Sequence, residues 1–101
     1  MINQRKVIIT EIVRQEFSAP VDYHINPKQS KAYVYPRKAL CMLIREYASF
    51  SLMEIARYLG KHEHSTIMHA IVDGKNLLTQ DEAFRASYQK SKERVKSLIN
   101  D

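Results

Sequence analysis

One stretch decides the fold of this chain: residues 51–70 read SLMEIARYLGKHEHSTIMHA. It opens with a capping box, in which the Ser51 hydroxyl accepts from the backbone N–H of Glu54 and the glutamate side chain reaches back to the cap. A short amphipathic helix follows, whose expected inward side chains are Leu52, Ile55, Ala56 and Leu59. Gly60 then stands where helices commonly end on a residue with left-handed backbone angles.

A second helix is expected to begin near Glu63 or His64. Apolar side chains resume the helical period after this point, at Ile67, Met68 and Ile71. Two helices joined by a short turn that contains glycine form a helix-turn-helix. The pattern predicts this unit over about residues 51–78, with Asp73 and Gly74 near the end of its second helix.

The rest of the chain also has a helical pattern, so we predict a small all-α fold and a single domain over residues 1–101. Only two glycines and three prolines interrupt it, too few for a sheet protein with many turns. A first helix is predicted over about residues 3–17, with an apolar stripe that includes Val7, Ile8, Ile12 and Phe17. One short helical turn is predicted at residues 21–25 and a loop at residues 26–34.

Two further helices complete the prediction. One covers about residues 36–47, because Pro36 fits a first helical turn, where its missing N–H costs nothing. The last begins at a second capping box, from Thr79 to Glu82. Its expected buried side chains are Phe84, Tyr88, Val95, Leu98 and Ile99. The methionines expected to fill the core are Met42, Met53 and Met68.

The positive charge is concentrated in the middle of the chain. The net charge is +5, and residues 28–75 hold eight basic and four acidic side chains, which is +4 of that +5. Such a bias suits a polyanionic partner. The single cysteine, Cys41, is expected to be a buried small apolar residue. We expect neither a signal peptide nor a membrane span, and we expect a cytoplasmic protein.

The segment from Gly60 to Ala70 carries the chemistry. In a helix-turn-helix, the first residues of the second helix contact base edges in the major groove of DNA. A carboxylate accepts from the amino group of cytosine, and serine and threonine hydroxyls both donate and accept. Free N–H groups of the first helical turn also bind phosphate. The sequence therefore predicts double-stranded DNA as the partner of this segment.

The residues from Pro36 to Ala70 resemble the C-terminal DNA-binding domain of the bacterial replication initiator DnaA. The signature of that family is close to Gly-Gly-Arg-Asp-His-Thr-Thr-Val-Leu-His-Ala, and this chain has Gly60-Lys61-His62-Glu63-His64-Ser65-Thr66-Ile67-Met68-His69-Ala70 in its place. Pro36-Arg37-Lys38 and Leu43-Ile44-Arg45-Glu46 also match at the family's spacing. The fold that the resemblance implies is a DnaA C-terminal, Trp-repressor-like helix-turn-helix.

The resemblance also implies roles for individual residues. Base contacts are implied for Glu63, His64, Ser65 and Thr66. Contacts with phosphates or a groove are implied for His69, Arg37 and Arg45, with Lys61 as a further candidate. The family places a loop arginine in the minor groove, but the loop before Pro36 has no arginine, so Lys28 and Lys31 are the candidates here.

The DnaA initiator also has an ATPase module. This chain has no Gly-x-x-x-x-Gly-Lys-Ser/Thr phosphate loop, so we expect no nucleotide binding, no cofactor and no enzymatic activity. The resemblance implies action at replication-origin or regulatory sites, in a bacterial nucleoid or a phage-infected cell. Replication proteins are further candidate partners.

Two alternatives compete with DNA binding. The histidines suggest a metal site, but His62 and His64 are two residues apart and diverge on a helix, whereas zinc proteases use His-Glu-x-x-His. We therefore expect no metal. The other alternative is a protein-interaction module of a replication or transcription complex, with Tyr33 and Tyr35 on its surface. DNA binding through phosphates weakens steeply with salt, which distinguishes the two.

Overall fold

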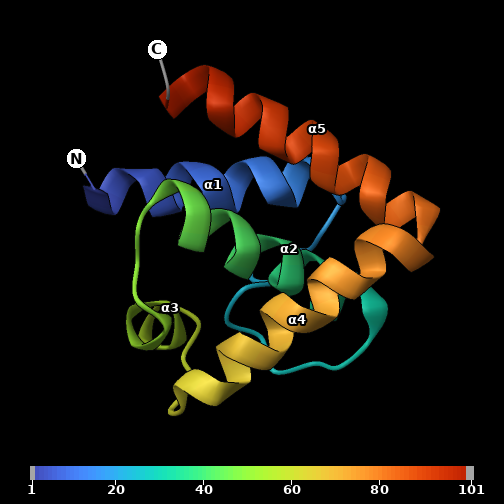
Figure 1. Ribbon diagram of the computed structural model, residues 1–101. Helices are drawn as coiled ribbons and strands as arrows, with labels where there is room; N and C mark the ends of the chain where they lie inside the picture. The colour runs from blue at the N-terminus through green and yellow to red at the C-terminus, as the bar shows by residue number, and fades with distance from the viewer. Residues whose placement is uncertain (1, 100–101) are drawn as a thin grey trace.

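The computed structural model describes residues 2–99, and that part of the chain forms five α-helices and no strand (Figure 1). The helices are α1 (Ile2–Glu16), α2 (Lys31–Tyr47), α3 (Leu52–Tyr58), α4 (His64–Gln80) and α5 (Glu82–Ile99). The predicted all-α class is confirmed, and α3 and α4 are the two helices of the predicted helix-turn-helix. None of these helices is long and apolar enough to cross a bilayer.

The helices are arranged around α2. Helix α1 packs against α2 and α5, while α4 packs against α2, α3 and α5. In Figure 1, α1 and α5 run in opposite directions along one side of the molecule, and the turn between α3 and α4 lies at the other side. The start of α4 is therefore far from the α1–α5 pair and open to a partner.

The buried apolar side chains come from all five helices, and the largest include Ile9, Leu40, Ile55, Ile67 and Phe84. On α1 the buried stripe is Ile9, Ile12 and Val13. The expectation that Val7 and Ile8 belong to it was wrong, because the core lies on the other side of the helix and leaves them 57% and 38% exposed. Leu98 was also expected to be buried, but it is 61% exposed near the end of α5.

Helix α2 begins five residues earlier than the sequence indicated. The predicted loop at residues 26–34 ends at Ser30, and Pro36 lies inside the helix rather than in its first turn. A proline there removes one backbone hydrogen bond, to the carbonyl four residues before it. That carbonyl belongs to Ala32, which is exposed, so water can replace the lost donor. The helical turn predicted at residues 21–25 lies in a run of hydrogen-bonded turns and in no regular helix. The Tyr23 N–H donates to the Pro20 carbonyl, and the Ile25 and Asn26 N–H groups donate to the Asp22 carbonyl.

Helix α4 continues through Asp73 and Gly74, where the sequence predicted its end. Gly74 is buried against α2, and a Cβ atom on it would lie 2.5 Å from the Met42 sulfur. The glycine thus allows close packing of two helices rather than ending one. Asp73 forms an ion pair with Lys38 of α2, with 3.5 Å between the Lys38 Nζ atom and the Asp73 Oδ2 atom.

Helix α5 is capped by Asp81, not by the predicted box at Thr79. The Asp81 carboxylate accepts from the Phe84 N–H at 2.9 Å, whereas the Thr79 hydroxyl donates to the Asn76 carbonyl inside α4. Because α4 extends to Gln80, Thr79 has helical backbone angles and cannot serve as a cap.

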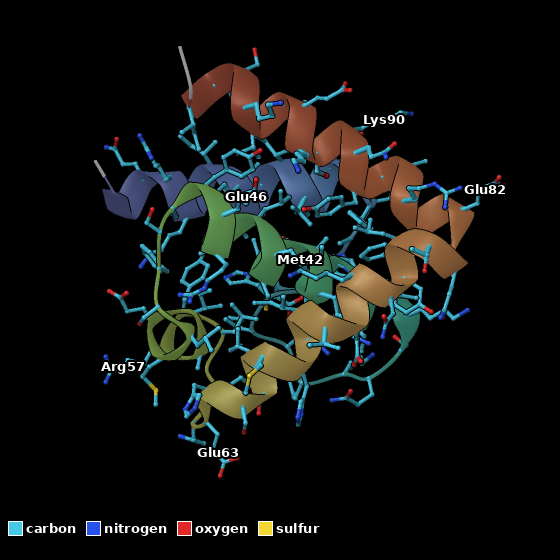
Figure 2. The ribbon with its side chains drawn as sticks, viewed as in Figure 1. Met42, Glu46, Arg57, Glu63, Glu82 and Lys90 are labelled. Atoms are coloured by element: carbon cyan, nitrogen blue, oxygen red, sulfur yellow. The ribbon has the colours of Figure 1, made fainter. Side chains whose placement is uncertain are left out.

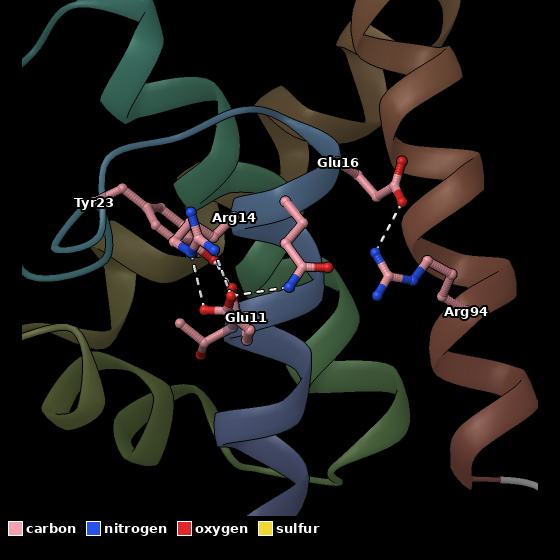
Figure 3. A network of polar contacts seen from close by, with 7 residues as sticks. Glu11, Arg14, Glu16, Tyr23 and Arg94 are labelled. Carbon is pink, nitrogen blue, oxygen red and sulfur yellow. Dashed lines mark hydrogen bonds and ion pairs between the residues drawn. The ribbon is translucent and has the colours of Figure 1, made fainter.

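Polar contacts add to the joint between α1 and α5. The Arg94 guanidinium of α5 donates to the Glu16 carboxylate of α1 at 2.9 Å (Figure 3). On α1 itself, Glu11 accepts from both Arg14 and Gln15, and these hydrogen bonds lower the pKa of Glu11 to about 2. Arg14 and Arg94 are thus both engaged with carboxylates of α1.

Candidate nucleic-acid interface

Helix α3 begins with the capping box that the sequence predicted. The Glu54 N–H donates to the Ser51 hydroxyl at 3.1 Å, and the Ser51 N–H donates to the Glu54 carboxylate at 2.8 Å. These hydrogen bonds lower the pKa of Glu54, because they favour its charged form. The box fixes where α3 starts, and so where the following turn leaves it.

The turn after α3 is fixed by Gly60, which has a φ of 72°. The Gly60 N–H donates to the Arg57 carbonyl and the Lys61 N–H donates to the Ala56 carbonyl, at 3.1 and 2.8 Å. This pair of bonds is a Schellman motif, the C-terminal cap that requires a left-handed residue at this position. The left-handed glycine predicted from the sequence is therefore confirmed.

Glu63 is the N-cap residue of α4, yet its carboxylate makes no capping hydrogen bond. Figure 2 shows its side chain pointing away from the body of the protein. His64 and Thr66 are exposed beside it, and Ser65 is half-buried. The structure thus brings the four predicted base-contacting residues together at one exposed helix start, with backbone N–H groups that no side chain caps. Base contact by these residues stays a prediction.

The outer face of α4 continues beyond this first turn. Ile67 is 1% exposed and turned to the core, while His69 is exposed on the opposite side. Met68, expected in the core, is 43% exposed, because it lies about 100° around the helix from Ile67. Val72 is 51% exposed. The sequence analysis gave neither residue a role in the interface, although both keep a four-residue spacing from His64.

A hollow of about 250 Å³ lies along one side of α4. Its lining includes Lys61 of the turn, Thr66 and His69 of α4, and Gln29 from the segment before α2. Arg37 and Cys41 of α2 also line it. Cys41 is 1% exposed, as expected for a small core residue, and burial raises the pKa of its thiol to about 12.

A second hollow, of about 160 Å³, lies along the other side of α4. Its lining includes Arg45 of α2 and Lys75 of α4. Arg45 is exposed, and its guanidinium donates to the Phe50 carbonyl at 2.8 Å, which orients it. The exposed face of α4 therefore has cationic side chains on both sides: Lys61 along one, and Arg45 and Lys75 along the other. Lys38 also lines the first hollow, but it is paired there with Asp73. Lys75 was not among the residues singled out from the sequence.

Arg37 is held differently from the other predicted phosphate ligands. It is 8% exposed, and its guanidinium donates to the backbone carbonyls of Tyr23, Asn26 and Lys28. Burial lowers the pKa of Arg37. Three of its five N–H groups thus attach residues 23–28 to α2. No sequence pattern predicts such partners.

Lys28 and Lys31, the predicted minor-groove residues, are exposed at the end of this fastened segment. The Lys28 ammonium lies 5.6 Å from the centre of the Tyr33 ring, and the Lys31 ammonium lies 5.5 Å from that of Tyr35. Cation–π contacts of this kind limit where the charges lie without neutralising them.

Within residues 2–99, no group of three or more His, Cys, Asp or Glu side chains gathers as a metal site would require.

Comparison with known proteins connects this geometry to a family. A family model described as the bacterial dnaA protein helix-turn-helix matches residues 7–73. The chromosomal replication initiator protein DnaA of Acinetobacter baylyi is 33% identical over 81 residues, which is 80% of this chain and 17% of that protein. The DnaA of Roseobacter denitrificans is 32% identical over 82 residues, 78% of this chain and 18% of that protein.

A solved structure supports the fold independently. The crystal structure of a DNA replication initiation factor superposes with a TM-score of 0.80 over 97% of this chain and 30% of the other, at 24% identity. The chain spans under one fifth of the length of the curated relatives it matches. The matched residues include α3, the left-handed turn and the first half of α4, which belong to the candidate interface described above. The chain therefore belongs to the bacterial DnaA helix-turn-helix family.

Proposed function

We propose that this chain binds double-stranded DNA sequence-specifically, with the start of α4 in the major groove. One observation carries the proposal: the exposed face of α4 begins with polar side chains and uncapped N–H groups, and cations line both of its sides. A helix in the major groove lies between two phosphate backbones, so it requires charge on both sides.

In this proposal, Glu63, His64, Ser65 and Thr66 contact base edges, and His69 lies one turn behind them. Arg45, Lys61 and Lys75 contact phosphates beside α4. Lys28 and Lys31 approach the neighbouring minor groove. Arg37 positions the segment that contains Lys28 rather than contacting phosphate, because its guanidinium is buried and three of its five N–H groups donate to carbonyls of that segment.

The relatives suggest where such binding would be used. They are chromosomal replication initiator proteins, so we propose that this chain acts at replication-origin or regulatory DNA sites. These 101 residues contain no nucleotide-binding phosphate loop, and we propose that they bind DNA without hydrolysing ATP.

Selection of bound duplexes from a random pool, followed by salt titration, tests the proposal. If about five phosphates are contacted, log affinity against log salt should have a slope of about −4 to −5. If no sequence is enriched, or if the affinity does not change with salt concentration, the proposal is contradicted and a protein-interaction module is favoured.

Variants separate base contact from phosphate contact. His64→Ala and Thr66→Ala should each lose about 1–3 kcal/mol on the selected duplex and little on random duplex. Arg45→Ala should weaken binding to every duplex and flatten the salt slope by about one unit. The matched control is Lys90→Ala, an exposed cation of α5 on the far side of the molecule (Figure 2), which should change neither quantity.

A further inference from the structure

Two large apolar side chains are exposed on the face of α4 that the proposal places in the groove. Met68 is 43% exposed and Val72 is 51% exposed. Neither belongs to the core, and neither is among the half-buried apolar side chains that pack against it, unlike the neighbouring Ala70 and Ile71. Packing of the core therefore does not explain why these two positions are apolar.

Their position on the helix is regular. His64, Met68 and Val72 are four residues apart, so they form one stripe along the helix. With a rise of about 1.5 Å per residue, the stripe is about 12 Å long, which corresponds to three or four base-pair steps of about 3.4 Å. The two apolar side chains thus continue the line that starts at a proposed base-contacting residue.

The charges beside this stripe indicate its occupant. Arg45 and Lys75 lie on one side of α4, and Lys61 lies on the other. The carboxylates in the same two hollows, Asp73 and Glu46, are paired with Lys38 and Lys92. A matching partner has two anionic walls and apolar groups between them. The major groove of DNA has this character, because phosphates border it and the 5-methyl group of thymine is the apolar group on its floor.

We infer that Met68 and Val72 contact thymine 5-methyl groups in the major groove and give this protein a preference for thymine beyond the bases met by the first turn of α4. The inference rests on the proposed function. The base it names is thymine, recognised by its 5-methyl group. A site that recognised bases by hydrogen bonds alone would not depend on that methyl group.

Deoxyuridine in place of thymidine tests this directly, since it removes the methyl group and leaves every hydrogen-bonding atom. The probe is the duplex selected from the random pool, with its thymines replaced one at a time. Wild-type protein should lose about fourfold in affinity for each contacted methyl group, the factor that corresponds to burial of one carbon group.

Variants show which side chains are responsible. Met68→Ala and Val72→Ala should each bind the thymidine duplex more weakly and lose the discrimination at one position, with a thymidine-to-deoxyuridine ratio near one there. The control is Leu98→Ala, a 61% exposed apolar residue of α5, which should keep the wild-type ratio. All three positions are exposed, and unchanged melting of the variants checks that they fold.

The outcomes separate this inference from the proposed function. Failure to select any duplex contradicts both. Selective, salt-dependent binding with equal affinity for thymidine and deoxyuridine duplexes, or a selected site without thymine, contradicts the inference alone. Discrimination that survives in both α4 variants also contradicts it, because the methyl groups would then be met by other residues.

Discussion

At the scale of single residues, Arg37 connects the fold to the proposed interface. Its buried guanidinium donates to three carbonyls of residues 23–28, and this segment leads to the exposed Lys28 and Lys31. A charged donor with several acceptors fixes a segment that has no regular secondary structure. In the proposed binding mode, this residue therefore affects DNA binding only through the segment that it holds.

Arg37→Ala should lower the free energy of unfolding by about 2–4 kcal/mol, because it leaves backbone carbonyls without their donor. Arg37→Lys keeps the charge but loses the fork, so it should recover only part of that loss. Urea unfolding measures both. A loss below about 0.5 kcal/mol for the alanine variant would show that water replaces the guanidinium without cost.

His24 predicts how stability depends on pH. Its Nδ1 atom is buried without a hydrogen-bond partner, and the ring lies between Tyr23 and Tyr58. Desolvation lowers the pKa of His24 in the folded state, and the charge of Asp22 opposes this only in part. The unfolded chain therefore takes up the proton first as pH falls below the ordinary value of 6.5.

This contribution to stability is present above pH 6.5 and is lost as pH falls through the folded-state pKa. Unfolding measured from about pH 8 to pH 5 should show a smaller loss for His24→Phe than for the wild type. Equal losses in the two proteins would mean that the imidazole titrates alike in both states.

At the scale of helices, the boundary between α4 and α5 depends on Asp81. Its carboxylate caps α5 and also lies at the positive end of that helix. Asp81→Ala should cost about 1 kcal/mol of stability, whereas Thr79→Ala should cost less than about 0.5 kcal/mol. Thermal or urea unfolding compares them. A larger loss for Thr79→Ala than for Asp81→Ala would instead support the capping box at Thr79 that the sequence predicted.

The packing of α4 on α2 depends on Gly74. A methyl group there overlaps the Met42 sulfur, so Gly74→Ala and Met42→Ala should not be additive. The double variant should be more stable than the sum of the two single losses by about 1 kcal/mol or more, since alanine also favours a helix over glycine. Additivity within about 0.5 kcal/mol would show that Met42 moves aside freely.

These elements show how far the sequence could predict the structure. Signals within four or five residues were sufficient for the Ser51 cap and the left-handed Gly60. The start of α2 and the end of α4 were missed, because Pro36 and Gly74 usually interrupt helices and here tertiary packing outweighs that preference. The sequence predicted that a helix forms at residues 3–17 more accurately than it predicted which face of that helix is buried, as the exposure of Val7 shows.

The candidate site was predictable to a similar extent. The polar start of α4 has a recognisable pattern, and the structure gathers those residues as expected. Arg37 could not be distinguished from Arg45 in the sequence, because its partners are backbone carbonyls of another segment. The exposure of Met68 depends on the direction from which α2 covers α4, which a single sequence does not contain.

At the scale of the whole molecule, the α1–α5 side differs from the side that carries the start of α4. The α1–α5 side joins the first and last helices and uses part of its charge internally, as the Arg94–Glu16 and Lys92–Glu46 pairs show. The opposite side carries the turn and the start of α4 (Figure 1). Cationic side chains line the hollows along this helix. DNA should therefore contact one side and leave the other in solvent.

Nuclear magnetic resonance of the isotope-labelled protein, titrated with its selected duplex, tests this central claim most directly. The largest changes in backbone amide shifts should fall in residues 61–72 and 28–31, with little change along the exposed face of α5. The largest changes along α1 and α5, with residues 61–72 unaffected, would contradict the assignment of α4 as the DNA-binding helix.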